Sequence, residues 1–260
     1  MKKNAWITVL KQEDNEEEAR KLHQTLSKYG LGTGGHLWRD DLPQMAWSGA
    51  LEELGKADTG IWIIAGRAVD FSEPNLRYGL SMLTAGVQAL RGNGFPILIA
   101  MIEGELEADS LPTLLRGAGV YPATSPTLGA KMAAKANLPI PKLAPEYHLN
   151  VYGIPNLGQW FEIGPADGAW KGALFGVNGG EIVVQGVGPA GKLPEKATLE
   201  YPIQGMKLEL AGDKYTAWGV QNQLSPDMSH YVKVNDHATS LVFGPMPDGD
   251  AADLFVLRLK

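Results

Sequence analysis

Two short, unbroken apolar runs in the first half of the chain constrain the fold more than any other feature. Residues 60–65 (GIWIIA) and 95–102 (FPILIAMI) are too short for core helices. They also lack the alternation of apolar and polar residues that is typical of a strand with one solvent-exposed face. Strands buried on both faces are typical of parallel sheets covered by helices. Between the two runs, apolar residues recur at helical spacing at Leu76, Leu80, Leu83, Val87 and Leu90. A strand, a helix and a strand in this order predict a right-handed βαβ unit.

The same alternation extends over roughly the first 136 residues. Strands are expected at 5–10, at 36–38 and around 120–121, and helices at 15–29, 48–54, 72–90 and 126–136, with Ser72 and Ser125 as caps of the last two. The glycine-rich stretch 30–35 is interpreted as a turn between the first helix and the second strand. This order predicts a flavodoxin-like, doubly wound parallel sheet of five strands. Such sheets bind ligands at the carboxyl ends of their strands, here the loops 11–14, 39–47, 66–72 and 103–107.

A proline-rich stretch separates this half from a second one of different character. Three prolines fall within residues 137–145, where neither a helix nor a central strand can persist. Beyond it, short strand-like runs, among them 197–201, follow one another at ~8–12-residue spacing between glycine-containing turns. We therefore predict an α/β domain at 1–138, a linker at 139–146 and a β-sandwich or barrel at 147–260.

Composition excludes several classes of function. The chain contains no cysteine, which rules out disulfides and thiolate chemistry and makes the cytoplasm the expected location. Its 23 basic and 29 acidic residues give a net charge of −6 without a basic cluster, so nucleic acid is not expected as a partner. No apolar run reaches the ~18 residues of a membrane span. The five histidines show no metal-ligand spacing, and no metal site is predicted.

Three segments of the first half resemble Toll/interleukin-receptor (TIR) domains, particularly bacterial ones. Residues 38–41 (WRDD) are similar to the start of the family's BB loop. Residues 51–58 lead into the apolar run 61–65 as the corresponding helix and strand of the family do, and Ser72 stands where the family has a serine at the start of a helix. The resemblance covers roughly residues 5–136, about half of the chain.

The resemblance implies an enzymatic activity, but this chain lacks the catalytic residue on which that activity depends. Active relatives cleave the nicotinamide–ribose bond of NAD with a glutamate five or six residues after this serine, and here those positions hold Arg77 and Tyr78. Residues 77–81 and 94–97 also resemble the framework of nucleoside deoxyribosyltransferases, again with arginine in place of glutamate. A cation beside a developing oxocarbenium ion would be repulsive. Glu73 and Glu103 are the carboxylates near the expected crevice that could substitute as catalytic residues.

The candidate ligand-binding residues come from the loops at the expected crevice. They are Lys11, Trp38, Arg39, Asp40, Arg67, Ser72, Arg77 and Tyr78. Arg77 is interpreted either as a solvent-facing side chain or as a guanidinium that holds a phosphate or carboxylate in a bidentate pair. No cofactor is required, and NAD or another nucleotide is the ligand to consider. In relatives the loop from Arg39 to Trp47 mediates self-assembly, so self-association or a protein partner is expected there.

Three functions are consistent with these features. The first is a cytoplasmic TIR-like signalling or assembly protein whose crevice binds a nucleotide without cleaving it. The second is a divergent NAD glycohydrolase or nucleoside-processing enzyme that uses Glu73 or Glu103. The third is a ligand sensor whose binding site lies in the second, all-β half.

Overall fold

The chain folds into two compact units, Met1–Leu143 and Ala144–Lys260. The structure is a computed structural model that describes residues 2–155, 157–247 and 253–260. The division falls inside the proline-rich stretch 139–146. None of the described helices combines the length and the apolar character needed to cross a membrane.

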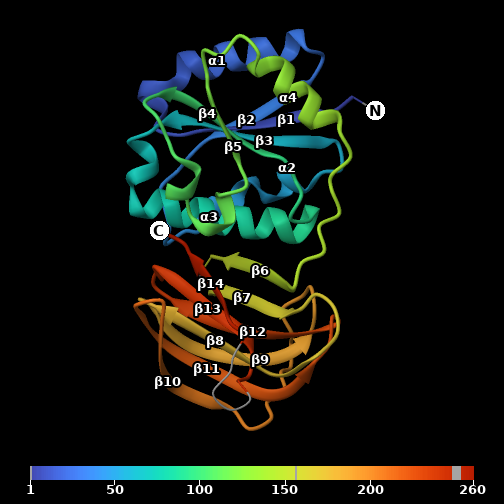
Figure 1. The fold of residues 1–260 in the computed structure, drawn as a ribbon, viewed down its shortest axis with the longest axis vertical. Helices are drawn as coiled ribbons and strands as arrows, with labels where there is room; N and C mark the ends of the chain where they lie inside the picture. Colours follow the sequence, from blue (N-terminus) through green and yellow to red (C-terminus); the bar gives the residue numbers. More distant parts are fainter. Residues whose placement is uncertain (1, 156, 248–252) are drawn as a thin grey trace. The chain divides into compact units, whose positions relative to one another are not determined.

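The first unit contains a five-stranded parallel sheet in the order β2-β1-β3-β4-β5 (Figure 1). The strands are β1 (Asn4–Val9), β2 (Gly32–Leu37), β3 (Thr59–Arg67), β4 (Ile97–Glu103) and β5 (Gly119–Pro122). Eight of the nine residues of β3 are buried, which explains its unbroken apolar sequence. This order confirms the predicted flavodoxin-like, doubly wound sheet.

The glycine-rich stretch before the second strand is part of the strand itself. The interpretation of residues 30–35 as a turn was wrong, because β2 starts at Gly32 and pairs with β1 from there on. A Cβ atom on Gly35 would lie 2.4 Å from the carbonyl oxygen of Ile7. The absence of side chains lets the edge strand approach β1 closely, a role that turn propensity alone does not reveal.

Helices cover both faces of the sheet. α1 (Gln12–Lys28) and α4 (Leu128–Asn137) lie on one face, and α2 (Leu51–Gly55) and α3 (Pro74–Arg91) lie on the other (Figure 1). Four 3₁₀ turns accompany them, η1 (Ala46–Ala50), η2 (Asp70–Ser72), η3 (Ala108–Ser110) and η4 (Thr113–Leu115). The expectation that Ser72 caps the third helix was wrong. Ser72 belongs to η2 and Glu73 precedes the helix, because Pro74 fits the first helical position and disfavours helical geometry in the residue before it.

The second unit is a sandwich of two antiparallel sheets, as predicted (Figure 1). One sheet has the order β10-β11-β8-β13-β14 and the other the order β6-β7-β12-β9. The strands are β6 (Tyr147–Ile154), β7 (Gly158–Pro165), β8 (Trp170–Asn178), β9 (Glu181–Pro189), β10 (Ile203–Leu210), β11 (Asp213–Leu224), β12 (Met228–Asn235), β13 (Ser240–Pro245) and β14 (Phe255–Arg258). The rings of Phe161 on β7 and Phe175 on β8 lie 5.3 Å apart, so these residues mark the inner faces of the sheets.

The expected strand at 197–201 is absent. This segment makes only an isolated bridge between Val187 and Thr198. Cβ atoms built on Gly186 and Gly188 of β9 would lie 2.6 Å from the side chains of Ala197 and Pro194. Residues 194–197 therefore cover the face of the β6-β7-β12-β9 sheet on which Glu162 and Tyr231 also lie. Glu200 continues to β11 of the other sheet, where its carbonyl oxygen accepts from the backbone N–H of Gln221.

Candidate functional site

The strand order places the topological switch point between β1 and β3. The connection after β1 leads to α1 on one face of the sheet, and the connection after β3 leads to α3 on the other (Figure 1). Ligands of doubly wound folds bind at the carboxyl ends of the strands where the connections diverge in this way. Lys11 lies just after β1 at this point, Arg67 is the last residue of β3, and Asp70 follows β3.

Asp70 is the central residue of the switch point. Its side chain is fully buried, and its Oδ2 accepts hydrogen bonds from the backbone N–H of Arg67 at 2.8 Å and from Nδ2 of Asn15 at 3.4 Å. Its Oδ1 lies 3.8 Å from Nζ of Lys11 and 3.9 Å from Nη2 of Arg67. Among the described residues, Oδ1 accepts no hydrogen bond. A buried carboxylate needs compensating charge, which the two cations supply.

Lys11 connects this buried carboxylate to a second, exposed one. Its Nζ lies 3.3 Å from Oε1 of Glu73, and the two side chains are 43% and 51% exposed. The residue itself adopts a left-handed conformation, with φ 43°, directly after β1. Two cations and two carboxylates therefore meet at the switch point, and we call Lys11, Arg67, Asp70 and Glu73 the switch-point cluster.

Asn15 supports this cluster from the first turns of α1. It is fully buried and donates Nδ2 to the carbonyl oxygen of Leu10 at 2.5 Å as well as to Asp70. Its Oδ1 has no hydrogen-bond partner within the described part of the chain. Analysis of the sequence missed both Asn15 and Asp70. The available signal was a polar side chain soon after each of two buried strands, at the edge where ligands were expected.

Arg77 and Tyr78, the residues that the resemblance to TIR domains singled out, lie on α3. The guanidinium of Arg77 donates Nη1 to the carbonyl oxygen of Phe71 at 2.9 Å and Nη2 to that of Ser110 at 2.7 Å. Burial, with a smaller contribution from Arg116, lowers the pKa of Arg77. Tyr78 is fully buried in the core. Arg77 thus connects η2 to η3, the turns that follow β3 and β4.

These contacts predict a structural rather than a binding effect of substitution at Arg77. We expect Arg77→Met to lower the free energy of unfolding by about 1.5–3 kcal/mol, because two carbonyl groups lose a charged donor. Urea unfolding of the full chain measures this loss. Arg20→Met, at an exposed pair with Glu16 on α1, is the control and should change stability by less than about 0.5 kcal/mol. An Arg77 variant as stable as the wild type would contradict the structural role.

The other predicted ligand-binding residues, and the catalytic candidate Glu103, belong to the loops and strand ends around the carboxyl edge. Arg39, Asp40, Ser72 and Glu103 are exposed, whereas Trp38 is half-buried. The indole of Trp38 packs over Gly79 of α3, where a Cβ atom would lie 2.6 Å from the ring. The structure therefore brings together Lys11, Arg67 and Glu73 of the predicted set.

The loop from residue 39 to 47 is anchored in the core. Leu42, Met45 and Trp47 are all buried, and Met45 adopts a left-handed φ of 52° immediately before η1. Arg39 and Asp40 at its start remain exposed. The anchored end gives the loop a defined shape while its first residues face solvent.

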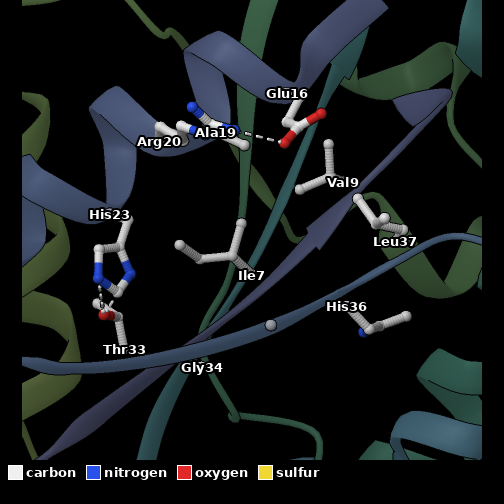
Figure 2. Close-up of a pocket in the computed structure, with 11 residues that line it drawn as sticks. Ile7, Val9, Glu16, Ala19, Arg20, His23, Thr33, Gly34, His36 and Leu37 are labelled. Atoms are coloured by element: carbon white, nitrogen blue, oxygen red, sulfur yellow. Dashed lines mark hydrogen bonds and ion pairs between the residues drawn. The ribbon is translucent and has the colours of Figure 1, made fainter. Parts of the chain in front are cut away.

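Two hollows border α1. One, of 470 Å³, lies between α1 and α4 at the carboxyl ends of β3 and β4, and Ala65, Ala100 and Ile102 line it. The other, of 330 Å³, lies between α1 and β2 (Figure 2). At its borders, His23 contacts Thr33 at 2.6 Å and Glu16 pairs with Arg20 at 2.8 Å. The described residues contain no group of three side chains placed to hold a metal ion.

Comparison with known proteins adds little to this site. No known family model and no curated protein matches the chain. Among solved structures, the chain is similar to the apo form of translation elongation factor SelB from Methanococcus maripaludis, with 13% identity and a TM-score of 0.29 over 91% of this chain. It spans about half of that protein's length, 52%. A likeness this weak says nothing about what this chain binds.

Proposed function

We propose that the α/β unit binds a nucleotide, NAD or a related one, at the carboxyl ends of β1 and β3, as part of a cytoplasmic TIR-like signalling or assembly protein. The observation that carries this proposal is the fully buried Asp70 within ion-pair distance of Lys11 and Arg67 at the switch point. A buried carboxylate fixes the two cations where doubly wound sheets hold phosphorylated cofactors. Cations positioned in advance lose little entropy when a phosphate binds.

We expect the phosphate to take the position that the exposed carboxylate of Glu73 occupies beside Lys11. Glu73 pairs with Lys11 at 3.3 Å, but both side chains are about half-exposed. Exposed pairs of this kind contribute only about 0–1 kcal/mol. A phosphate group carries more charge and three acceptor oxygens, so it can displace Glu73 from Lys11. Asp70 stays in place beneath Lys11 and Arg67.

The neighbouring hollow has room for the rest of such a ligand. Its 470 Å³ falls in the range of about 300–1,000 Å³ that is usual for small-molecule sites. Ala65, which lines it, lies on β3 two residues before Arg67. Leu22 and Ile102 contribute an apolar surface of the kind on which a nucleobase can pack.

Substitutions in the cluster should change nucleotide affinity in opposite directions. We expect Lys11→Gln and Asp70→Asn to weaken the binding of NAD and ADP at least about tenfold, since one removes a phosphate contact and the other its anchor. Glu73→Gln should strengthen binding several-fold, because the competing carboxylate is gone. Isothermal titration of the full chain measures all three. The control is Glu53→Gln, which removes an exposed pair with Lys56 on α2. Unchanged affinity in Lys11→Gln, or no binding of either nucleotide to the wild type, would overturn the proposal.

Cleavage of the bound nucleotide is the second candidate function, and the position of Glu73 favours it. Glu73 and Asp70 share Lys11, so carboxylates stand at the edge where Arg77 and Tyr78 offer none. A carboxylate near the ribose would stabilise an oxocarbenium-like transition state. Incubating the full chain with concentrated NAD and measuring nicotinamide distinguishes the candidates. Release that is lost in Glu73→Gln or Glu103→Gln would show an enzyme, whereas no release leaves a binding domain.

Assembly through the 39–47 loop has a separate test. Arg39, Asp40, Pro43 and Gln44 are the exposed residues of this loop between positions 39 and 47. We expect light scattering to show a mass that rises with protein concentration, and Arg39→Glu to reduce that rise. A strictly monomeric wild type, with and without NAD, would exclude self-association.

A further inference from the structure

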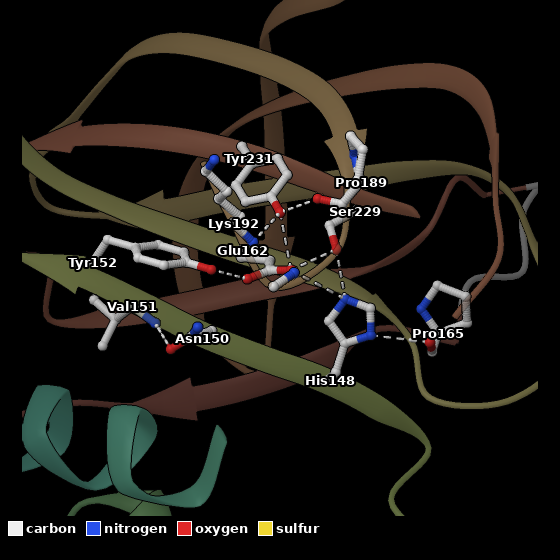
Figure 3. Close-up of polar contacts among 11 residues, drawn as sticks. His148, Asn150, Val151, Tyr152, Glu162, Pro165, Pro189, Lys192, Ser229 and Tyr231 are labelled. Atoms are coloured by element: carbon white, nitrogen blue, oxygen red, sulfur yellow. Dashed lines mark hydrogen bonds and ion pairs between the residues drawn. The ribbon is translucent and has the colours of Figure 1, made fainter. Parts of the chain in front are cut away.

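A buried carboxylate in the second unit collects four hydrogen-bond donors. Glu162 on β7 is 2% exposed and lies on the outer face of its sheet, beneath the segment that covers this face (Figure 3). Its Oε1 accepts from the backbone N–H of Gly191 at 2.6 Å and from Oγ of Ser229 at 2.7 Å. It also lies 3.1 Å from the hydroxyl of Tyr231, whose single proton is shared with the carbonyl oxygen of Pro189. Its Oε2 accepts from the hydroxyl of Tyr152 at 2.5 Å. Each of these four contacts places a donor group against an oxygen of the carboxylate.

The neighbouring phenols remain protonated. Burial and the hydrogen bond to Glu162 raise the pKa of Tyr152 well above its usual value. Burial and the charge of Glu162 raise the pKa of Tyr231 to about 12. Both hydroxyl groups therefore keep their single proton at neutral pH. Neither hydroxyl group gains or loses its proton near neutral pH.

The ring of His148 on β6 is held from both sides. Nδ1 lies 3.0 Å from the carbonyl oxygen of Pro165, and Nε2 lies 2.9 Å from Oγ of Ser229 (Figure 3). A carbonyl oxygen only accepts, so Nδ1 must carry a proton. The single proton of the Ser229 hydroxyl is directed to Glu162, so Oγ can only accept from Nε2. Both ring nitrogens act as donors, which is the pattern of an imidazolium ion.

The same network holds the segment that covers the sheet. Gly191 donates its N–H to Glu162, and the hydroxyl of Tyr231 donates to the carbonyl oxygen of Pro189 at 2.5 Å and accepts from the backbone N–H of Lys192 at 3.3 Å. Residues 189–192 are thus attached to the sheet through Glu162 and Tyr231. Nε2 of His148 lies 4.0 Å from Oε1 of Glu162, with Ser229 between them.

We propose that His148, Ser229 and Glu162 form a proton-operated latch for residues 189–192. With the second proton on His148, every contact in the chain from Pro165 to Glu162 has a donor, and the buried carboxylate has a positive charge beside it. When that proton leaves, the single hydroxyl proton of Ser229 faces two acceptors, so one contact is lost. The carboxylate also loses its neighbouring charge, and the cover becomes easier to detach.

His148 is placed to respond to the pH of the solution. Its side chain is 27% exposed, so protons can reach it, while Glu162 is sealed beneath the cover. The other titratable groups on the elements around it are Tyr152 on its own strand, Tyr231 and Lys233 on β12, Lys192 on the cover, and Glu146, Asp167 and Asp227 at the strand ends. By residue type, histidine is the member of this set that ordinarily changes charge between about pH 5 and about pH 8.

Nitrogen-15 NMR of the full chain, combined with hydrogen exchange, tests the latch. The His148→Gln variant identifies the NMR signals of His148, because these signals are absent from its spectrum. We expect protons on both ring nitrogens at about pH 5.5 and on one at about pH 8.5. After correction for intrinsic exchange rates, the amides of Ala190, Gly191 and Lys192 should exchange about tenfold faster when His148 carries one ring proton.

Variants of the full chain separate the latch from a merely structural role. His148→Gln and Ser229→Ala should abolish the pH response of residues 189–192, and His23→Gln, at an exposed histidine on α1, should keep it. A single ring proton on His148 at about pH 5.5 would overturn the proposal. So would a pH response of the cover that persists unchanged in His148→Gln.

Discussion

Replacing Glu162 by alanine is expected to lower the free energy of unfolding by about 3–5 kcal/mol, because four donors lose their shared acceptor in a buried setting. Gly191, Ser229 and Tyr152 donate to this one carboxylate, and Tyr231 shares its hydroxyl proton between Glu162 and Pro189. At least two of these donors lie where water cannot replace the lost oxygen, since Ser229 and Tyr231 are fully buried. Urea unfolding of the full chain measures the loss, and hydrogen exchange in residues 158–165 and 228–235 assigns it to the second unit.

Glu162→Gln is the matched control for this prediction. Glutamine keeps the size of the side chain and one acceptor oxygen, but its amide group faces hydroxyls that need an acceptor. We expect an intermediate loss of about 1–3 kcal/mol. A Glu162→Ala protein within about 1 kcal/mol of the wild type would mean that the network does not bind this side chain in solution.

The second large effect is acid lability caused by His230 in the core of the sandwich. This residue is fully buried, and its Nε2 donates to Oε1 of Gln185 at 3.1 Å. Nδ1 has no partner among the described residues. Burial lowers the pKa of His230 to about 3. The folded chain therefore keeps this imidazole neutral at pH values where an unfolded chain would protonate it.

The direction of the pH effect follows from proton linkage. An unfolded histidine has a pKa of about 6.5, so between about pH 6.5 and about pH 3 the unfolded state binds more protons than the folded state. The free energy of unfolding falls as the pH falls through this window. At about 1.4 kcal/mol per pKa unit, the loss from His230 reaches at most about 5 kcal/mol at the acid end. Above about pH 6.5 the residue contributes no pH dependence.

The slope of the free energy of unfolding against pH, compared between wild type and a variant, separates the contribution of His230 from that of the carboxylates. His230→Leu loses the hydrogen bond to Gln185, so its stability at neutral pH is expected to be lower. Its stability should nevertheless fall less steeply between about pH 6.5 and about pH 4, measured by urea unfolding at several pH values. His23→Gln, at an exposed histidine, should keep the wild-type slope. Identical slopes in wild type and His230→Leu would show that the buried imidazole does not govern acid stability.

The first half of the chain was predictable in outline because its pattern is local. The unbroken run of β3, the apolar stripe of α3 and the glycine after it each follow from neighbouring residues. Where local signals competed, the prediction failed. Turn propensity in residues 30–35 concealed the start of β2, and the hydroxyl of Ser72 suggested a cap one residue before the actual one.

The site was predictable only to the level of its loops. Lys11, Arg67 and Glu73 came from the rule that ligands bind at the carboxyl edge of a doubly wound sheet. The register comparison with TIR domains focused attention on Arg77, whose guanidinium instead binds two backbone carbonyls. Which side chains are buried within a loop is set by packing, and sequence pattern does not report it.

The sequence by itself determined the fold class of both halves. Side chains on one face recur every two residues in a strand and every 3.6 residues in a helix, so neighbouring residues are enough to reveal the pattern. Only the tertiary structure decided which polar groups meet. Asn15 and Asp70 are 55 residues apart, and Ser229 and Glu162 are 67 apart. Contacts over such separations depend on strand order and register, which place distant residues within hydrogen-bond distance and leave no periodic trace in the chain.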